Sequence, residues 1–148
     1  MNEPTESTLG GDTSPVIDAM PPAQVGMQVR HRRYVSYDHA HYAGNLVDGA
    51  YGVALFGDVA TEMCVRTDGD EGLFASYSDI QFLAPIAAGD CIEVIATLVR
   101  VGRRSREMEF ALHVTARGNP SRGASAADVL TSPLLATTAR GVVVVAAG

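Results

Sequence analysis

The sequence contains no lysine and no tryptophan, and all 11 of its basic residues are arginine. A protein Schiff base, including the anchor of pyridoxal phosphate, needs a lysine amine, so this chain cannot form one. No apolar run reaches about 18 residues, the length that a membrane-spanning helix requires, so we expect no membrane partner. The net charge of -6 argues against nucleic acid as a partner, because phosphates are bound by basic surfaces.

Cysteine is also scarce. Cys64 and Cys91 are the only two, and they match no zinc-ligand spacing. The opening residues, MNEPTESTLGGDTSP, lack the basic and apolar regions of a signal peptide, so we expect a cytoplasmic protein with reduced thiols. The 148 residues, 47% of them hydrophobic, are enough for one domain with its own core.

Composition and periodicity divide the chain into a tail and one domain. Residues 1–26 are rich in Pro, Gly, Ser and Thr without periodicity, which predicts a flexible tail. The domain, residues 27–148, begins with a predicted edge strand at 27–36. A helix is predicted from Asn45 to about Val65, and the turn cluster at 67–72 ends it.

Four more strands are predicted after the helix. Residues 73–85 have strand propensity up to Pro85, and a last strand with an apolar end closes the chain. Between them, two segments alternate apolar and polar residues, the apolar ones being Ile92, Val94, Ala96, Leu98, Met108, Phe110, Leu112 and Val114. This order predicts an α+β domain with one antiparallel sheet. One helix cannot cover five strands, so we expect a homodimer or higher homo-oligomer.

The predicted helix has two distinct stripes of residues. We expect one face to be buried closely against another element, because its residues are small or apolar: Leu46, Ala50, Val53, Ala54, Gly57, Ala60 and Cys64. Either Asp48 or Asn45 is expected to cap the helix N-terminus. The other stripe steps by three and four residues through Asp48, Tyr51, Leu55, Asp58 and Glu62.

Two acids in the second stripe, Asp58 and Glu62, are one turn apart. Like charges at this spacing repel, and the helix dipole disfavours anions near the C-terminus. One explanation is a solvated surface stripe. The other is a pocket in which the two carboxylates interact, so that one stays ionised and the other takes up a proton more readily, as proton transfer requires.

The segment HAHYAGNLVDGA, residues 39–50, concentrates polar side chains just before the helix. His39 and His41 lie on the same side if the segment is extended, but a metal would need further ligands, and the spacing matches no standard motif. We therefore predict no metal site. His31 and His113 fall in strand patterns and are interpreted as structural.

Glycines bracket the predicted helix start at Gly44 and Gly49. They leave backbone N–H groups accessible, and a helix N-terminus stabilises a carbonyl oxygen that becomes an enolate or oxyanion. The alternative is that Gly44 serves only a turn.

An arginine run, VRVGRRSRE at residues 99–107, falls at a predicted hairpin. It contains Arg100, Arg103, Arg104 and Arg106. The run is either a solvated turn or a clamp for the phosphates of a nucleotide-bearing ligand.

Several of these segments, taken in order, resemble the hotdog superfamily of acyl-CoA enzymes. AHYAGNLVDGA is similar to the loop-to-helix motif of its thioesterases, and SDIQFLAPIAAGDCIEVIATLVRVGRRS is similar to their strand pair. With GDVATE, TDGDEG and the ending SPLLATTARGVVVVAA, the resemblance is to the β-aminoacyl-CoA ammonia-lyase branch and spans roughly residues 28–147. It implies a long central helix wrapped by a five-stranded antiparallel sheet, and a dimer in which the opposing subunit supplies part of the site.

The sequence departs from the thioesterase pattern at two positions. Aligned without gaps, the thioesterase loop asparagine and helix acid fall on His41 and Phe56. The acids stand instead at Asp58 and Glu62, as in the lyase branch, which favours elimination over hydrolysis.

The resemblance implies a lyase that reversibly eliminates ammonia from a 3-aminoacyl-CoA, such as 3-aminobutyryl-CoA or β-alanyl-CoA, to give the 2-enoyl-CoA. Asp58 or Glu62 would remove the α-proton, and the other acid would bind the ammonium group. The enolate oxygen would lie near Asp48 and Gly49. His41, Tyr42 and Asn45 would orient the thioester or shuttle protons, and Arg100, Arg103, Arg104 and Arg106 would bind the phosphates of coenzyme A.

No cofactor is implied beyond the coenzyme A of the substrate. Two alternatives stay open: an acyl-CoA thioesterase and a non-catalytic acyl-CoA-binding module.

Overall fold

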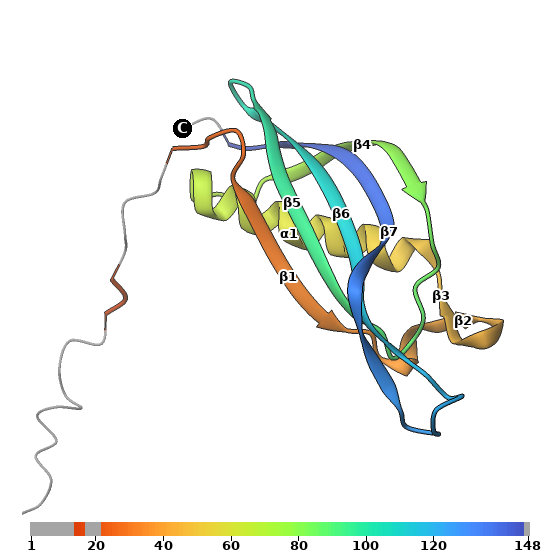
Figure 1. Ribbon diagram of the computed structural model, residues 1–148. Coiled ribbons are helices and arrows are strands. Elements are labelled where there is room, and N and C mark those ends of the chain that lie inside the picture. Colours follow the sequence, from red (N-terminus) through yellow and green to blue (C-terminus); the bar gives the residue numbers. More distant parts are fainter. Residues whose placement is uncertain (1–13, 17–21, 147–148) are drawn as a thin grey trace, which may run out of the picture.

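The computed structural model describes residues 14–16 and 22–146 as one helix packed against one face of an antiparallel sheet (Figure 1). The main elements are β1 (Gln28–Tyr34), α1 (Gly49–Asp68), β4 (Leu73–Phe82), β5 (Cys91–Val101), β6 (Ser105–Gly118) and β7 (Ala127–Val144). The predicted tail, residues 1–26, lies mostly outside the described residues. No described helix is long and apolar enough to cross a bilayer.

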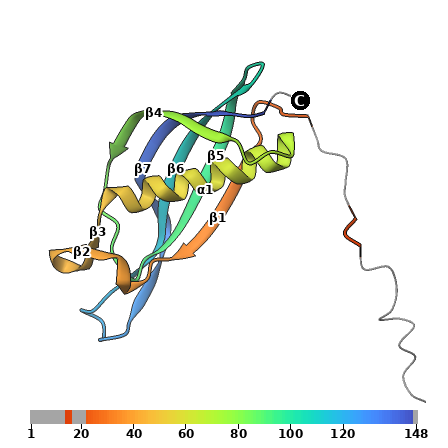
Figure 2. The ribbon, with the colours of Figure 1, turned by 180° about the vertical axis from the view of Figure 1, so that it is seen from behind.

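The five long strands form one sheet in the order β1-β5-β6-β7-β4, and every pairing is antiparallel. This confirms the predicted α+β architecture, with a central helix on a five-stranded sheet. The predicted edge position of residues 27–36 is also confirmed, because β1 pairs only with β5. The opposite edge is β4, so the two edges flank the helix (Figure 2).

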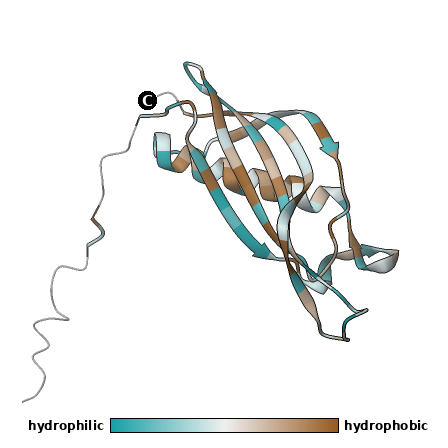
Figure 3. Ribbon diagram, viewed as in Figure 1, coloured by the Kyte–Doolittle hydropathy of each residue, from teal (hydrophilic) through white to brown (hydrophobic). Residues whose placement is uncertain are grey.

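Alternation along β5 and β6 builds the core. The predicted inward residues are all buried: Ile92, Val94, Ala96, Leu98, Met108, Phe110, Leu112 and Val114. Their neighbours along each strand face outward, where hydrophilic and hydrophobic segments mix, and β1 is mostly hydrophilic (Figure 3). Phe110 stacks on Phe56 of α1 with ring centroids 5.1 Å apart, which joins the sheet to the middle of the helix.

The buried face of α1 differs from the predicted one. It consists of Gly52, Phe56, Val59, Ala60, Met63, Cys64 and Thr67, so only Ala60 and Cys64 of the predicted face are buried. Ala50 and Ala54 are exposed. The largest apolar side chains decide the orientation, because burying Phe56 and Met63 removes more apolar surface from water than burying alanines. Ala50 and Ala54 therefore face away from the core, whereas Ala60 and Cys64 lie beside the large apolar side chains.

Candidate functional site

The segment between β1 and α1 is folded by short local elements. These are η2 (Tyr37–His39), β2 (Ala40–Tyr42), η3 (Ala43–Asn45) and β3 (Leu46–Val47), with β2 paired to β3. Gly44 and Asn45 have φ angles of 74° and 60°, the left-handed region that glycine and asparagine tolerate best. The Asn45 carbonyl accepts a hydrogen bond from the Ala88 N–H, which pins the segment to the connection before β5.

Asp48 caps the N-terminus of α1, which decides between the two predicted caps. Its Oδ1 accepts a hydrogen bond from the Tyr51 N–H at 2.9 Å. The other oxygen, Oδ2, lies 3.9 Å from His41 Nδ1. The first backbone N–H groups of the helix therefore start beside a carboxylate and an exposed histidine.

Gly49, the first residue of α1, lies under the ring of Phe82 at the end of β4. A Cβ atom at position 49 would stand 2.5 Å from Phe82 Cε1, so only glycine permits this approach. The ring and the helix N-terminus together form one side of a hollow of about 390 Å³. Its lining residues are Tyr42, Val47, Asp48, Gly49, Phe82, Leu83, Ala84, Pro85, Ile86 and Thr137.

This hollow unites three of the predicted substrate-binding residues, Tyr42, Asp48 and Gly49. The fourth, Asn45, is not among the lining residues, and its backbone conformation explains an asparagine there. Thr137 was missed by the sequence interpretation. Its only signal is a polar residue at an inward position of the last strand, and it is 2% exposed.

The histidines before the helix lie on different elements and make different contacts. The ring of His39, in η2, is 4.5 Å from that of Tyr51, and the ring of His41, in β2, meets Tyr42 edge-on at 4.6 Å. Within residues 14–16 and 22–146, no group of three or more His, Cys, Asp or Glu side chains could hold a metal ion.

Glu62 is held by two partners on different elements. Its Oε1 lies 2.9 Å from His31 Nε2 on β1, and its Oε2 accepts a 2.9 Å hydrogen bond from Arg66 Nε one turn later. These hydrogen bonds, from Arg66 first and then His31, lower the pKa of Glu62. His31, interpreted from the sequence as structural, is thus a direct partner of a candidate catalytic acid.

Asp58 is exposed and makes no hydrogen bond or ion pair with the described residues. Its charge acts on Tyr77 of β4, whose pKa is raised to about 12, chiefly by burial and then by Asp58. Asp58 therefore lies towards β4, whereas Glu62 is tied to β1. The predicted interaction between the two carboxylates has no counterpart among the contacts of Glu62, whose partners are His31 and Arg66.

Both acids are far from the helix N-terminus of their own chain. Asp58 follows Gly49 by nine residues and Glu62 follows it by thirteen. At about 1.5 Å per residue, the acids lie about 14 and 20 Å along the axis. A base must come within about 3 Å of the proton that it abstracts. Neither acid can therefore act on a thioester bound at its own helix N-terminus.

Phe56, the position that the ungapped alignment matches to a thioesterase acid, is 0% exposed in the core. No side chain there can reach a substrate. Phe56 therefore serves the core, and its identity does not discriminate between elimination and hydrolysis.

The arginine run occupies the β5–β6 turn, at the end of the sheet where α1 finishes (Figure 1). Arg100, Arg103 and Arg104 are exposed. Arg106 is buried, and its guanidinium donates to both carboxylate oxygens of Asp68 and to the carbonyls of Gly102 and Ser105. The expectation that Arg106 binds phosphate is therefore wrong, because its donors are already used inside the protein.

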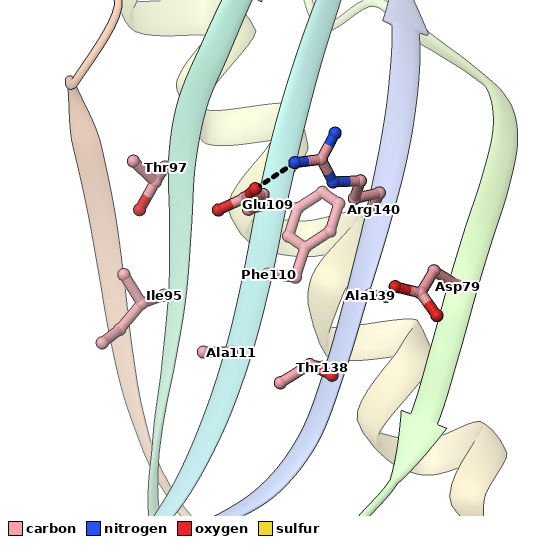
Figure 4. A pocket seen from close by; sticks show the side chains of 9 residues that line it. All are labelled: Asp79, Ile95, Thr97, Glu109, Phe110, Ala111, Thr138, Ala139 and Arg140. Carbon is pink, nitrogen blue, oxygen red and sulfur yellow. Dashed lines mark hydrogen bonds and ion pairs between the residues drawn. The ribbon is translucent and has the colours of Figure 1, made fainter.

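A second hollow lies on the outer face of the sheet (Figure 4). Arg140 forms an ion pair with Glu109 across it, and Thr97, Asp79 and Thr138 stand around this pair. The helix passes behind the sheet in this view. The hollow is therefore separated by the sheet from every candidate residue at the helix N-terminus.

Comparison with known proteins adds three findings. A family model described as the thioesterase superfamily matches residues 44–119. The chain is 45% identical over 111 residues to the 3-aminobutyryl-CoA ammonia lyase of Acetoanaerobium sticklandii, covering 75% of this chain and 88% of that protein. It is 38% identical to the β-alanyl-CoA:ammonia lyase of Clostridium propionicum, with a TM-score of 0.77, covering 83% of this chain and 87% of that structure.

The fold is shared more widely. A hexameric hotdog-fold thioesterase of Campylobacter jejuni superposes with a TM-score of 0.66 at 18% identity, over 78% of this chain and 80% of that one. At this identity the likeness shows the fold alone.

Proposed function

This chain belongs to the thioesterase superfamily and, within it, to the family of the aminoacyl-CoA ammonia lyases, and from that membership we propose its reaction. It is a carbon–nitrogen lyase that reversibly eliminates ammonia from a 3-aminoacyl-CoA to give the 2-enoyl-CoA. The observation that carries the proposal is the similarity to two ammonia lyases over more than four fifths of their length. Because the substrate is a coenzyme A ester, we place the reaction in the cytoplasm.

The hollow at the N-terminus of α1 suits the acyl part of such a substrate. Apolar walls from Val47, Phe82, Leu83 and Ile86 accommodate a short carbon chain. The N–H groups of Gly49 and the following residue can donate hydrogen bonds to the thioester oxygen. They would stabilise the negative charge that develops on this oxygen as the α-proton leaves. Tyr42 lines the hollow, and His41 lies 3.9 Å from Asp48, so we assign both to orienting the thioester.

The reaction needs one base and a departing amine. The base takes the α-proton, the electron pair forms the double bond, and the bond between the β-carbon and nitrogen breaks. Ammonia leaves and takes the proton from the base as ammonium. We assign the base to Asp58, because it is exposed and unpaired among the described residues, whereas Glu62 is engaged by His31 and Arg66.

Asp58 lies about 14 Å along α1 from the helix N-terminus of its own chain, so one site needs residues from two subunits. Asp58 of the partner subunit reaches the helix N-terminus if the two helices run antiparallel about a two-fold axis. The β4 edge supports such a dimer. Among the described strands β4 pairs only with β7, so its outer side is open, and it carries Leu73 and Phe82 at 78% and 61% exposed. The exposed small residues of α1 beside Asp58, Ala50 and Ala54, allow a second helix to approach closely.

The coenzyme A phosphates are assigned to the exposed arginines of the β5–β6 turn, Arg100, Arg103 and Arg104. This turn lies at the end of the sheet opposite the N-terminus of α1 (Figure 1). A two-fold axis across the β4 edge brings the partner's turn to the end where the acyl hollow opens. The same dimer therefore accounts for both the base and the phosphate contacts.

Incubation with crotonyl-CoA or acryloyl-CoA and ammonium tests the proposal. Addition of ammonia removes the enoyl absorbance, and the expected product is the 3-aminoacyl-CoA, identified by mass. A thiol reagent in a parallel sample detects free coenzyme A. Release of thiol without the amine adduct would overturn the lyase assignment in favour of hydrolysis.

A further inference from the structure

Thr137 is a buried residue whose hydroxyl has no partner among the residues that the structure describes. The structure describes four buried polar or charged residues, Thr67, Asp90, Arg106 and Thr137. The Thr67 hydroxyl donates to the Met63 carbonyl, and Asp90 and Arg106 form ion pairs. Thr137 alone of the four makes no side-chain hydrogen bond to any described residue.

The hydroxyl of Thr137 opens into the hollow at the start of α1. Every described side-chain oxygen or nitrogen that is sealed from solvent has a hydrogen-bond partner. The unpaired Thr137 Oγ1 therefore keeps some accessible surface, although the residue is 2% exposed. Thr137 lines the hollow, so that surface faces the space where the acyl chain is proposed to bind.

Gly52, in the first turn of α1, shows how closely the helix passes the Thr137 hydroxyl. A Cβ atom at position 52 would stand 3.2 Å from Leu112 Cδ1 and 3.8 Å from Thr137 Oγ1. The helix thus passes directly over Thr137, one turn after the N–H groups that are proposed to hold the thioester oxygen. The hydroxyl lies on the floor of the hollow, beyond the helix N-terminus.

The hydroxyl of Thr137 gives the fold no described contact that valine would lack. Valine would fill nearly the same space without placing a polar atom in an apolar hollow. The walls beside Thr137 are apolar, from Ala84 and Ile86. The hydroxyl is therefore explained by a ligand that brings a polar atom into an otherwise apolar hollow.

We propose that Thr137 Oγ1 binds the amino nitrogen of the substrate. This inference rests on the proposed function. The thioester oxygen is an acceptor and is served by the helix N–H groups, so it does not need Thr137. The 3-amino group is the polar atom further along the acyl chain, and it donates to a hydroxyl oxygen. In the addition direction, the same contact holds ammonia against the β-carbon.

Two variants with matched shapes test the contact. Thr137→Val removes the hydroxyl and keeps the volume, whereas Thr137→Ser keeps the hydroxyl. In the addition reaction, we expect Thr137→Val to raise the KM for ammonium roughly 10- to 100-fold, the effect of losing a hydrogen bond to a polar or charged group. The KM for the enoyl-CoA, which has no amino group, should stay within about twofold of wild type. Thr137→Ser should restore the ammonium KM.

The unfolding temperature separates binding from a structural role. Because the hydroxyl has no partner in the described part of the chain, Thr137→Val should unfold at the wild-type temperature or above it. An unchanged ammonium KM, or an equal rise in the KM for enoyl-CoA, would overturn the assignment. If Thr137→Val does not fold, Thr137→Ala removes the same hydroxyl and carries the same expectations. Failure of the wild-type protein to add ammonia would instead refute the proposed function.

Discussion

Arg106 and Asp68 form a bidentate ion pair that fastens the start of β6 to the last residue of α1. The Nε–Oδ2 and Nη2–Oδ1 distances are 3.0 and 2.6 Å. The two side chains are 8% and 18% exposed. Burial raises the pKa of Asp68, but the hydrogen bonds from Arg106 and Thr67 outweigh it and leave that pKa below its usual range. Arg106 thus belongs to the scaffold, although the other arginines of the run, Arg100, Arg103 and Arg104, are exposed.

Replacing Arg106 should therefore reduce stability. Arg106→Met leaves the Asp68 carboxylate shielded and unpaired, and we expect a loss of about 3 kcal/mol in the free energy of unfolding. Chemical denaturation at pH 7 measures it. Arg103→Met, at an exposed position of the same turn, is the matched control and should change stability by less than about 0.5 kcal/mol. Equal losses in both variants would contradict the structural assignment.

Three carboxyl groups with lowered pKa values predict how the stability of the protein depends on pH. The pKa values of Asp68, Glu62 and Glu93 are all lowered in the folded protein. A carboxyl group with a lowered pKa contributes stability above its unfolded value of about 4, and that contribution is lost as the pH falls through the folded value. The free energy of unfolding should therefore stay level between about pH 7 and 5 and fall below about pH 4.

In Arg106→Met the dependence on acid should be weaker. Protonation of Asp68 removes the unpaired charge that destabilises this variant. The difference in stability between wild type and variant should shrink as the pH falls below about 4. Denaturation curves of both proteins at pH 3 and pH 7 measure the difference in free energy of unfolding between wild type and variant at each pH. The same difference at both pH values would show that Asp68 is not the group involved.

The exposed arginines of the β5–β6 turn should affect only substrates that carry the nucleotide. Arg103→Ala should raise the KM for an enoyl-CoA roughly 3- to 10-fold, because a charge-assisted contact to phosphate is lost. The corresponding enoyl-pantetheine, which lacks the adenosine and its 3′-phosphate, should show a smaller change. Equal effects on both substrates would place Arg103 away from the nucleotide.

The two acids of α1 should respond differently to neutralisation. Asp58→Asn should lower turnover on the order of 10²-fold or more, because the proposed base is removed. Glu62→Gln is the matched control one turn away, and it should stay within several-fold of wild type because Glu62 is already engaged by Arg66 and His31. Steady-state rates of ammonia addition at saturating substrate measure both. The reverse order would assign the base to Glu62.

Mixed dimers test whether one site uses two subunits. Asp58→Asn should be inactive, and so should Gly49→Val, whose side chain meets Phe82. Co-expression at equal levels should restore about a quarter of the wild-type sites, since half of randomly assembled dimers are mixed and each has one site without either substitution. Differently tagged subunits allow the mixed dimer to be purified. A mixture without activity would mean that Asp58 and Gly49 act within one chain.

Local patterns in the sequence determined the elements. Alternation predicted the apolar inward residues of β5 and β6 from Ile92 to Val114, although not the buried Arg106. For the start of α1 the sequence offered Asn45 or Asp48 as the cap, and the structure decided for Asp48, with the helix beginning at Gly49 rather than at Asn45. The order of the motifs also indicated the family, since this order depends only on the residue types along the chain.

Contacts between distant residues were decided only by the tertiary structure. The face of α1 that is buried depends on what the sheet offers opposite Phe56, and Arg106 is fixed by a partner 38 residues away. Likewise, a threonine in β7 becomes part of the hollow only because Gly52 brings α1 over it. Periodicity predicts the helix or strand to which a residue belongs. Its partners, its burial and the atoms that it can contact depend on distances across the fold. For that reason the sequence could nominate Asp58 and Gly49, whereas the burial of Phe56 and the pairing of Arg106 with Asp68 emerged only from the folded chain.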